Sequence, residues 1–232
     1  MYSPIARASC RMITAQGFTL TELLVVIAII GSLSALTFPA LKNAYAKSRS
    51  DVCVSNMRQL GVAINLYAAD NDGRLPVSYV VGSNGPDNNW WYRINSYTGA
   101  APMAANWTSI FLRSQEAPYY CPETPKTKVI AGNLWVSYKM SMKLRLAQSG
   151  AQLGVTDGFP RVRVSEYAKI LLLAEGRVAP EFNEYTTNSP ATGVRYPHVG
   201  KLNGLFMDGH IESFTQEQLK ARWSECCPNV LY

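Results

Sequence analysis

The sequence is poor in histidine, cysteine and charge, and each shortage excludes a class of protein. Only two histidines occur among 232 residues, which excludes a metal site built mainly from histidine. Five cysteines are too few for a disulfide-dense scaffold but leave room for one or two bridges. Charged residues make up 16%, and the net charge of +6 is scattered along the chain, so we expect no nucleic-acid partner. The 47% of hydrophobic residues is nevertheless enough for a folded core.

One long apolar run lies near the N-terminus, at residues 18–38 (FTLTELLVVIAIIGSLSALTF). As a helix this run would be about 30 Å long, which matches the hydrocarbon core of a bilayer. A helix that is apolar on every face over this length is typical of a membrane span. Its one ionisable residue is Glu22, and a carboxylate inside a membrane costs about 2.5–3.5 kcal/mol. Either the Glu22 side chain extends to the membrane–water interface, or it pairs with a cation from another subunit.

The start of this run, GFTLTEL at residues 17–23, resembles the processing motif of type IV pilins and type II secretion pseudopilins. The resemblance implies that residues 1–17 are a leader, which a prepilin peptidase removes by cutting between Gly17 and Phe18. It further implies N-methylation of Phe18, and pairing of Glu22 with the N-terminal amine of a neighbouring subunit. The other partners that it implies are further pilin or pseudopilin subunits, the assembly platform and membrane lipid.

A secretory signal peptide is the rival interpretation of the same segment. Such a peptide normally has an apolar core of about 7–15 residues and a small-x-small cleavage site, which residues 32–34 (SLS) could imitate. The length of the run and the presence of Glu22 argue against it. Basic residues flank the run on both sides, so charge does not decide the orientation. From the resemblance we expect a single-pass inner-membrane protein with a periplasmic globular domain, which could also reach a surface filament.

The segment at residues 40–69 continues the helical pattern beyond the span at 18–39. Its apolar residues recur at spacings of four and three, which places them on one stripe, and we expect this amphipathic helix to pack its stripe under a sheet. The stripe consists of Cys53, Met57, Leu60, Ile64 and Tyr67. The following sequence, DNDGR from Asp70, predicts a helix stop with Gly73 in an unusual backbone conformation. Calcium binding by Asp70 and Asp72 is a weaker alternative, because the sequence fails the EF-hand pattern; otherwise we expect no cofactor.

Residues 70–232 are expected to form a β-rich globular domain with an irregular insertion at 76–135. That insertion is rich in Gly, Pro, Asn and aromatic residues, which either cover the sheet or form a ligand platform. Strand-like patterns follow at 136–144, 161–164, 169–174, 204–207 and 210–214. Between the last two, Asp208-Gly209 predicts a two-residue hairpin turn. The expected fold is α+β, with one long N-terminal helix of pilin type packed on an antiparallel sheet.

The stretch HVGKLNGLFMDGH, from His198 to His210, resembles the H-x9-DG signature of one large group of pilin-like proteins. The role of this signature does not follow from the resemblance. A structural role, in which His198 hydrogen-bonds the turn at Asp208 and Gly209, is the first interpretation. Metal binding and acid–base chemistry by the two histidines and Asp208 are the alternatives.

Four cysteines remain after the leader is removed, which fits an oxidising compartment. A bridge between Cys53 and Cys121 would tie the helix to the middle of the globular domain. The pairing of Cys226 and Cys227 cannot be deduced from the sequence.

The sequence therefore predicts a structural subunit and no enzyme. We expect processing by a prepilin peptidase, followed by assembly into a type II secretion pseudopilus or a filament like a type IV pilus. The alternatives are a ligand- or glycan-binding module that Trp90 and Trp91 would serve, displayed on a pilin anchor, and a secreted enzyme using His198 and Asp208.

Overall fold

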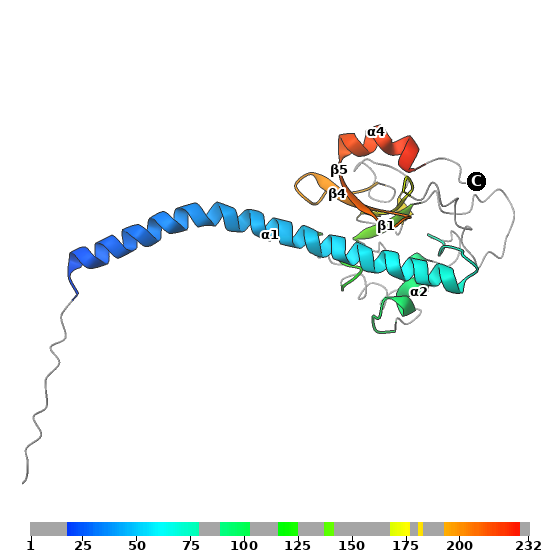
Figure 1. The fold of residues 1–232 in the computed structure, drawn as a ribbon, viewed down its shortest axis with the longest axis horizontal. Coiled ribbons are helices and arrows are strands. Elements are labelled where there is room, and N and C mark those ends of the chain that lie inside the picture. Colours follow the sequence, from blue (N-terminus) through cyan, green and yellow to red (C-terminus); the bar gives the residue numbers. More distant parts are fainter. Residues whose placement is uncertain are drawn as a thin grey trace, which may run out of the picture. The chain divides into compact units, whose positions relative to one another are not determined.

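The computed structural model describes residues 18–78, 89–102, 116–124, 137–141, 168–176, 181–182 and 193–227. Its elements are, in chain order, α1 (Leu20–Asp70), α2 (Trp90–Ile94), the 3-10 helix η2 (Asn95–Tyr97), β1 (Tyr138–Ser141), β2 (Leu171–Glu175), β3 (Glu181–Phe182), β4 (Lys201–Phe206), β5 (Ile211–Thr215) and α4 (Gln216–Cys226) (Figure 1). The chain divides into two compact units, one ending at Tyr45 and one beginning at Ala46. The predicted leader, much of the predicted insertion and the pattern at 161–164 lie outside the described residues.

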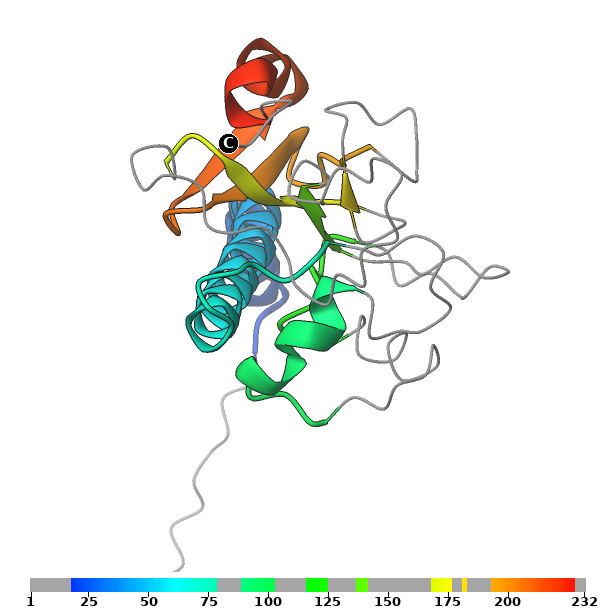
Figure 2. The same ribbon diagram turned by 90° about the vertical axis from the view of Figure 1, so that its right-hand side faces the viewer.

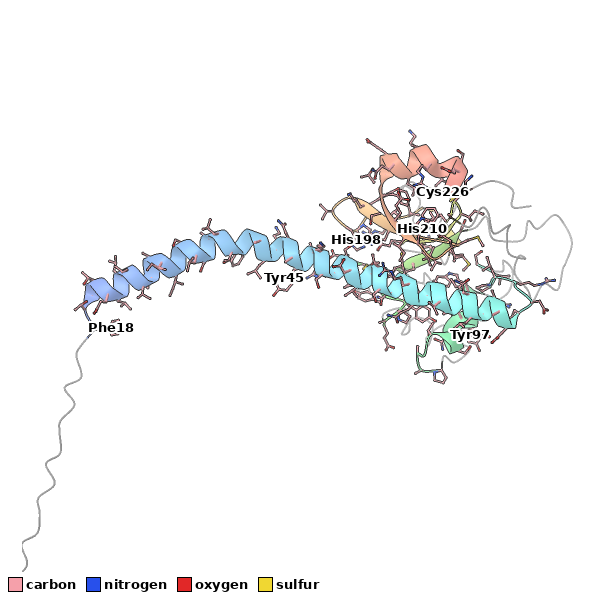
Figure 3. All side chains as sticks on the ribbon, viewed as in Figure 1. Phe18, Tyr45, Tyr97, His198, His210 and Cys226 are labelled. Atoms are coloured by element: carbon pink, nitrogen blue, oxygen red, sulfur yellow. A yellow bond between two sulfur atoms is a disulfide. The ribbon has the colours of Figure 1, made fainter. Side chains whose placement is uncertain are left out.

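The first unit contains the N-terminal part of α1, which is helical from Leu20 through the rest of the predicted membrane span and continues through Pro39. By length and composition, α1 is the one helix among the described residues that could cross a membrane. Its large apolar side chains from Phe18 to Leu41 are exposed and project from the helix all round (Figure 3). A helix without a polar face needs an apolar environment, which a bilayer or neighbouring helices would supply.

In the second unit, the stripe predicted for α1 is buried, which confirms that prediction. Cys53, Met57, Leu60 and Ile64 are fully buried and Tyr67 nearly so. The side chains expected on the opposite face are exposed, namely Ser55, Arg58, Gln59 and Asn65.

The helix ends at Asp70, where the sequence predicts a stop. Gly73 has φ +76°, a conformation that glycine adopts without steric cost, and its amide donates a hydrogen bond of 2.8 Å to the carbonyl of Ala68. This turn closes the C-terminal end of α1 and leads the chain away from the helix axis.

The five strands form one sheet in the order β3-β1-β2-β4-β5. The pairs β1–β2, β2–β4 and β4–β5 are antiparallel, as expected, and form a four-stranded antiparallel core. The short edge strand β3 is parallel to β1, which differs from the purely antiparallel sheet that we predicted. The α+β class with a pilin-like layout is confirmed.

The hairpin between β4 and β5 is longer than predicted. Its loop contains three residues, Met207, Asp208 and Gly209, because the amide of Phe206 donates to the carbonyl of His210 and the amide of Gly209 donates to the carbonyl of Phe206. Gly209 has φ +92°, as expected for the left-handed residue that closes a three-residue hairpin loop. The two-residue turn predicted at Asp208-Gly209 is therefore wrong by one residue, although the position of the hairpin is right.

Helices cover both faces of the sheet (Figure 2). On one face, the stripe of α1 packs with Tyr138, Met140 and Leu173 of the strands and with Trp90 and Trp91 of α2. On the other face, a second cluster joins Leu202, Phe206 and Phe214 to Leu219 and Cys226 of α4. Helix α4 was not among the elements predicted, although its capping box of Thr215 and Gln218 is visible in the sequence.

The two tryptophans of α2 belong to the core, as does Tyr119 from the segment at 116–124. Trp90 is fully buried, Trp91 is 3% exposed and Tyr119 is 4% exposed. Asn89 starts this short helix, because its side chain accepts hydrogen bonds from the amides of Trp91 and Tyr92. Trp90 and Trp91 therefore cover the sheet, as the first of the two interpretations holds, and the alternative of a ligand platform at these two residues is wrong because neither ring is exposed.

Candidate assembly site and buried cysteine–histidine cluster

The first helical turn carries the residues that the processing motif singles out. Phe18 is 82% exposed and precedes α1, whereas Gly17 lies outside the described residues. The Glu22 carboxylate accepts a hydrogen bond of 2.9 Å from the Thr19 amide and one of 2.8 Å from the Thr19 hydroxyl. In return, the Glu22 amide donates to the Thr19 hydroxyl oxygen at 3.2 Å. Thr19 and Glu22 thus form a reciprocal capping box at the start of α1.

This capping box gives Glu22 a role within its own chain that the sequence analysis did not consider. The pattern Thr19-x-x-Glu22 before an apolar run is a known signal for a helix start and could have been found. The carboxylate is exposed, and it lies within one turn of Phe18. A cation brought to this end of the helix would therefore find an accessible carboxylate that currently caps the helix.

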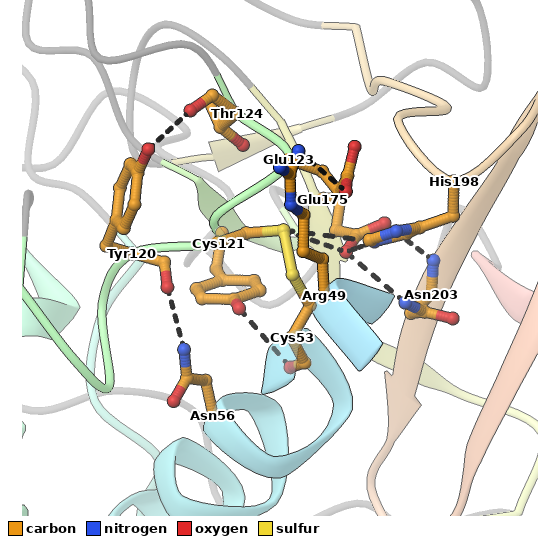
Figure 4. The surroundings of a disulfide bond; sticks show 11 residues. Arg49, Cys53, Asn56, Tyr120, Cys121, Glu123, Thr124, Glu175, His198 and Asn203 are labelled. Atoms are coloured by element: carbon orange, nitrogen blue, oxygen red, sulfur yellow. Dashed lines mark hydrogen bonds and ion pairs between the residues drawn. A yellow bond between two sulfur atoms is a disulfide. The ribbon is translucent and has the colours of Figure 1, made fainter. Parts of the chain in front are cut away.

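In the second unit, Cys53 of α1 and Cys121 form a disulfide bond (Figure 4). Both residues are fully buried. Two hydrogen bonds lie next to it. The Asn56 side chain donates a hydrogen bond of 2.7 Å to the carbonyl of Tyr120, and the Tyr138 hydroxyl donates one of 3.2 Å to the carbonyl of Cys53. The bridge and these bonds hold α1, the segment at 116–124 and β1 together.

Next to the disulfide, His198 and Glu175 form a buried pair. His198 Nε2 lies 2.5 Å from Glu175 Oε1, and the two side chains are 7% and 1% exposed. The amide of Asn203 donates 2.8 Å to Glu175 Oε2. Burial raises the pKa of the Glu175 carboxyl above its ordinary value, and the hydrogen bonds from His198 and Asn203 oppose this shift.

The partner of His198 differs from the one that we expected. We predicted a hydrogen bond to the turn at Asp208, but His198 Nε2 faces Glu175 and its Nδ1 is buried without a partner among the described residues. Asp208 instead accepts hydrogen bonds from the amide and the Nδ1 of His210, whose ring stacks on Phe206. The chain turns at Val199 and Gly200, which both have positive φ, and the His198 ring faces Glu175 of β2 rather than the hairpin.

Sequence reasoning missed Glu175. This acid ends the apolar run of β2, and an acid at the end of a buried run is a signal that it needs a partner. No sequence spacing connects it to His198, because the pairing of β2 with β4 brings the two residues together only in the folded sheet.

This cluster contains the residue types that ligate metals, with its two cysteines joined in the disulfide, and its geometry differs from that of a catalytic triad. Cys121 Sγ lies 3.8 Å from both His198 Nε2 and Glu175 Oε1. A cysteine triad needs the thiol and the acid on opposite nitrogens of the imidazole, whereas here both face Nε2. Ligand atoms of Cys53, Cys121, Glu175 and His198 lie within 4.8 Å of one another, and they form the one such cluster found in the described parts of the chain.

The two acids considered for calcium are located at the end of α1. Asp70 accepts a hydrogen bond of 3.1 Å from the Tyr97 hydroxyl, and Asp72 is exposed in the turn with φ +52°. In the described ranges, neither acid joins a cluster of three or more His, Cys, Asp or Glu ligands.

Cys226 and Cys227 are buried at the end of α4, and neither is part of a disulfide. Burial raises the pKa of Cys226 above its ordinary value, so its thiol form is favoured. The structure thus places them in the second core cluster and away from the disulfide.

Comparison with known proteins identifies one family in the N-terminal segment. Residues 12–38 match the model of the prokaryotic N-terminal methylation motif. No curated protein and no solved structure gives a significant match to the chain. The match contains the Gly17–Phe18 bond, the capping box at Glu22 and the exposed apolar part of α1. The chain therefore carries the prepilin-type N-terminal motif of a pilin-like subunit that a prepilin peptidase processes, followed by a helix that fits a single-pass membrane anchor.

Proposed function

We propose that this protein is a structural subunit of a type II secretion pseudopilus or of a filament like a type IV pilus. In this proposal a prepilin peptidase cuts between Gly17 and Phe18 and N-methylates Phe18. The protein then resides in the inner membrane with its globular domain on the periplasmic side, until an assembly platform adds it to other pilin subunits. It acts through assembly and catalyses no reaction.

The observation that carries the proposal is the exposed apolar part of α1, whose one charged group is at its first turn. Thirteen large apolar side chains between Phe18 and Leu41 are at least 45% exposed: Phe18, Leu20, Leu23, Leu24, Val25, Val26, Ile27, Ile29, Ile30, Leu33, Leu36, Phe38 and Leu41. Membrane lipid would cover this surface before assembly, and apolar helices of other subunits would cover it afterwards.

The capping box suggests how Glu22 could act both in the free subunit and in the assembled filament. In the free subunit its carboxylate accepts from the Thr19 amide and hydroxyl, which satisfies groups that a helix start leaves unpaired. In the filament the same carboxylate would receive the charged N-terminal amine of Phe18 from a neighbour. Both partners of that contact would be charged, whereas only the carboxylate is charged in the capping box, so the contact with the amine would be the stronger one in an apolar surrounding.

Two variants of Glu22 separate charge from capping. Glu22→Gln keeps a side-chain oxygen that can accept from Thr19, as in natural capping boxes, but loses the charge. Glu22→Ala loses both. Asp51→Asn is the matched control, because Asp51 is an exposed acid on the same helix outside the motif.

Each variant is expressed in a host with the assembly system, and its intact mass and its presence in sheared surface filaments and in cross-linked membrane oligomers are measured. We expect all three to begin at Phe18, and both Glu22 variants to be missing from filaments and oligomers. Subunits in the sheared fraction would indicate a pilus, whereas oligomers confined to the membrane would indicate a pseudopilus. Normal assembly of Glu22→Gln would contradict the charge pairing and leave capping as the role of Glu22.

A further inference from the structure

We propose that the dithiol form of Cys53 and Cys121 binds one Zn²⁺ together with Glu175 and His198, and that this zinc site and the disulfide exclude each other. The chain is synthesised with thiols, so the dithiol form precedes the disulfide. This inference concerns the second unit alone and does not depend on the proposed assembly.

The four residues supply the ligands that zinc prefers. Thiolate sulfur, imidazole nitrogen and carboxylate oxygen are its protein ligands, and four of them complete a closed tetrahedral site. Here they come from α1, the segment at 116–124, the end of β2 and the segment before β4. Ligands contributed by four separate parts of the chain would make the metal a cross-link, as the disulfide is.

The distances are close to those of a tetrahedral site. With Zn–S of about 2.3 Å and Zn–N or Zn–O of about 2.1 Å, a sulfur should lie about 3.6 Å from a nitrogen or oxygen ligand. Cys121 Sγ lies 3.8 Å from His198 Nε2 and also 3.8 Å from Glu175 Oε1. The remaining changes are that the two sulfurs separate to about 3.8 Å and that the metal replaces the short Glu175–His198 contact.

The surroundings also suit a buried ion. Cys53 and Cys121 are fully buried, Glu175 is 1% exposed, and the Asn203 amide holds the second carboxylate oxygen of Glu175 at 2.8 Å. Such an outer contact orients a metal-binding carboxylate. With Zn²⁺ bound, two thiolates and one carboxylate leave a net charge of only −1 at the site, because the metal replaces the two thiol protons.

The chemistry of the exchange is a two-electron step coupled to metal release. A trialkylphosphine and one water convert the disulfide to two thiols and give the phosphine oxide. Binding of Zn²⁺ to the two thiols then releases two protons. In the opposite direction, glutathione disulfide takes up two electrons and two protons to give two glutathione thiols, while the Cys53–Cys121 bond forms and Zn²⁺ leaves.

The test uses the full processed chain in detergent micelles, before and after reduction with a trialkylphosphine. Zn²⁺ is titrated and counted after gel filtration, and Co²⁺ serves as the spectroscopic probe, because tetrahedral Co²⁺ with thiolate ligands has intense visible bands. We expect one ion per reduced chain, none at this site in the disulfide form, and release of the ion when glutathione disulfide is added. The Co²⁺ spectrum of the wild-type chain reports the ligands without any substitution.

The variants assign the ligands. His198→Ala should weaken Zn²⁺ binding about tenfold or more, because removing even a residue that only hydrogen-bonds a metal ligand lowers metal affinity by at least about tenfold. His210→Ala is its matched control, because His210 also pairs with an acid but lies outside the cluster. Cys226→Ala/Cys227→Ala removes the other two thiols of the processed chain and should leave binding unchanged.

Two results would overturn the proposal. One is the absence of stoichiometric binding in the reduced wild-type chain. The other is binding that survives in Cys53→Ser/Cys121→Ser or is lost in Cys226→Ala/Cys227→Ala, because the ion would then be held by other residues.

Discussion

Removal of the Cys53–Cys121 bond should destabilise the second unit strongly. The two cysteines are 68 residues apart, and closing a loop of this length lowers the entropy of the unfolded chain. The chain-entropy relation gives about 4.4 kcal/mol at 25 °C for such a loop. Cys53→Ala/Cys121→Ala should lose this amount and, in addition, the packing of two fully buried sulfurs.

Urea unfolding followed by tryptophan fluorescence measures the effect, because all five tryptophans follow Tyr45 and so report on the second unit. With a slope of about 2 kcal/mol/M for urea, a loss of 4.4 kcal/mol lowers the midpoint by about 2 M. The control is Cys226→Ala/Cys227→Ala, which removes two buried sulfurs without breaking a disulfide. The reduced wild-type chain, with a chelator present to remove metal ions, should have a urea midpoint close to that of the Cys53→Ala/Cys121→Ala variant.

The reasoning is refuted if the midpoint of Cys53→Ala/Cys121→Ala falls no further than that of the control. The destabilisation would then come from lost packing, and the bond would not constrain the unfolded chain.

Three further predictions concern the same unit. Leu60→Ala should cost 2–5 kcal/mol in urea unfolding, since Leu60 is fully buried, whereas Val62→Ala, at a side chain 59% exposed, should stay within about 0.5 kcal/mol. Burial raises the pKa of the Glu175 carboxyl above its ordinary value of 4.5. The protonated carboxyl therefore contributes its full stabilisation below pH 4.5, and this stabilisation is lost as the pH rises through the folded pKa. The free energy of unfolding measured from about pH 4 to about pH 8 should thus depend less on pH in Glu175→Gln than in wild type, and an equal dependence would contradict this. Thr215→Ala should lower stability by about 1 kcal/mol by removing the N-cap of α4, while Thr215→Ser should not.

Local patterns predicted the features that depend on nearby residues. The apolar run at 18–38, the 3–4 spacing from Cys53 to Tyr67 and the stop at Gly73 each follow from backbone geometry within a few turns. The position of the β4–β5 hairpin was readable for the same reason. Its loop length was not, because the bond from the Phe206 amide to His210 depends on how the strands pair rather than on Asp208-Gly209 itself.

Features that depend on distant residues were not predictable in this way. Glu175 and His198 are 23 residues apart, and the pairing of β2 with β4 brings them together. Cys121 lies 54 residues before Glu175, outside the strands, and meets this pair only in the folded unit. The burial of Trp90 and Trp91 likewise follows from packing against α1, whereas their composition also allowed an exposed platform. The capping boxes at Thr19 and Thr215 are a different case, since both were visible in the sequence and were overlooked.

The N-terminus of the processed protein tests the central claim most directly. Intact-mass and N-terminal peptide analysis should be made on the protein from native membranes. The account predicts a chain that begins with N-methylated Phe18 and has lost residues 1–17. A chain that begins near residue 35, as a signal peptidase would leave it, would contradict the account, because the apolar helix and Glu22 would then be absent from the mature protein.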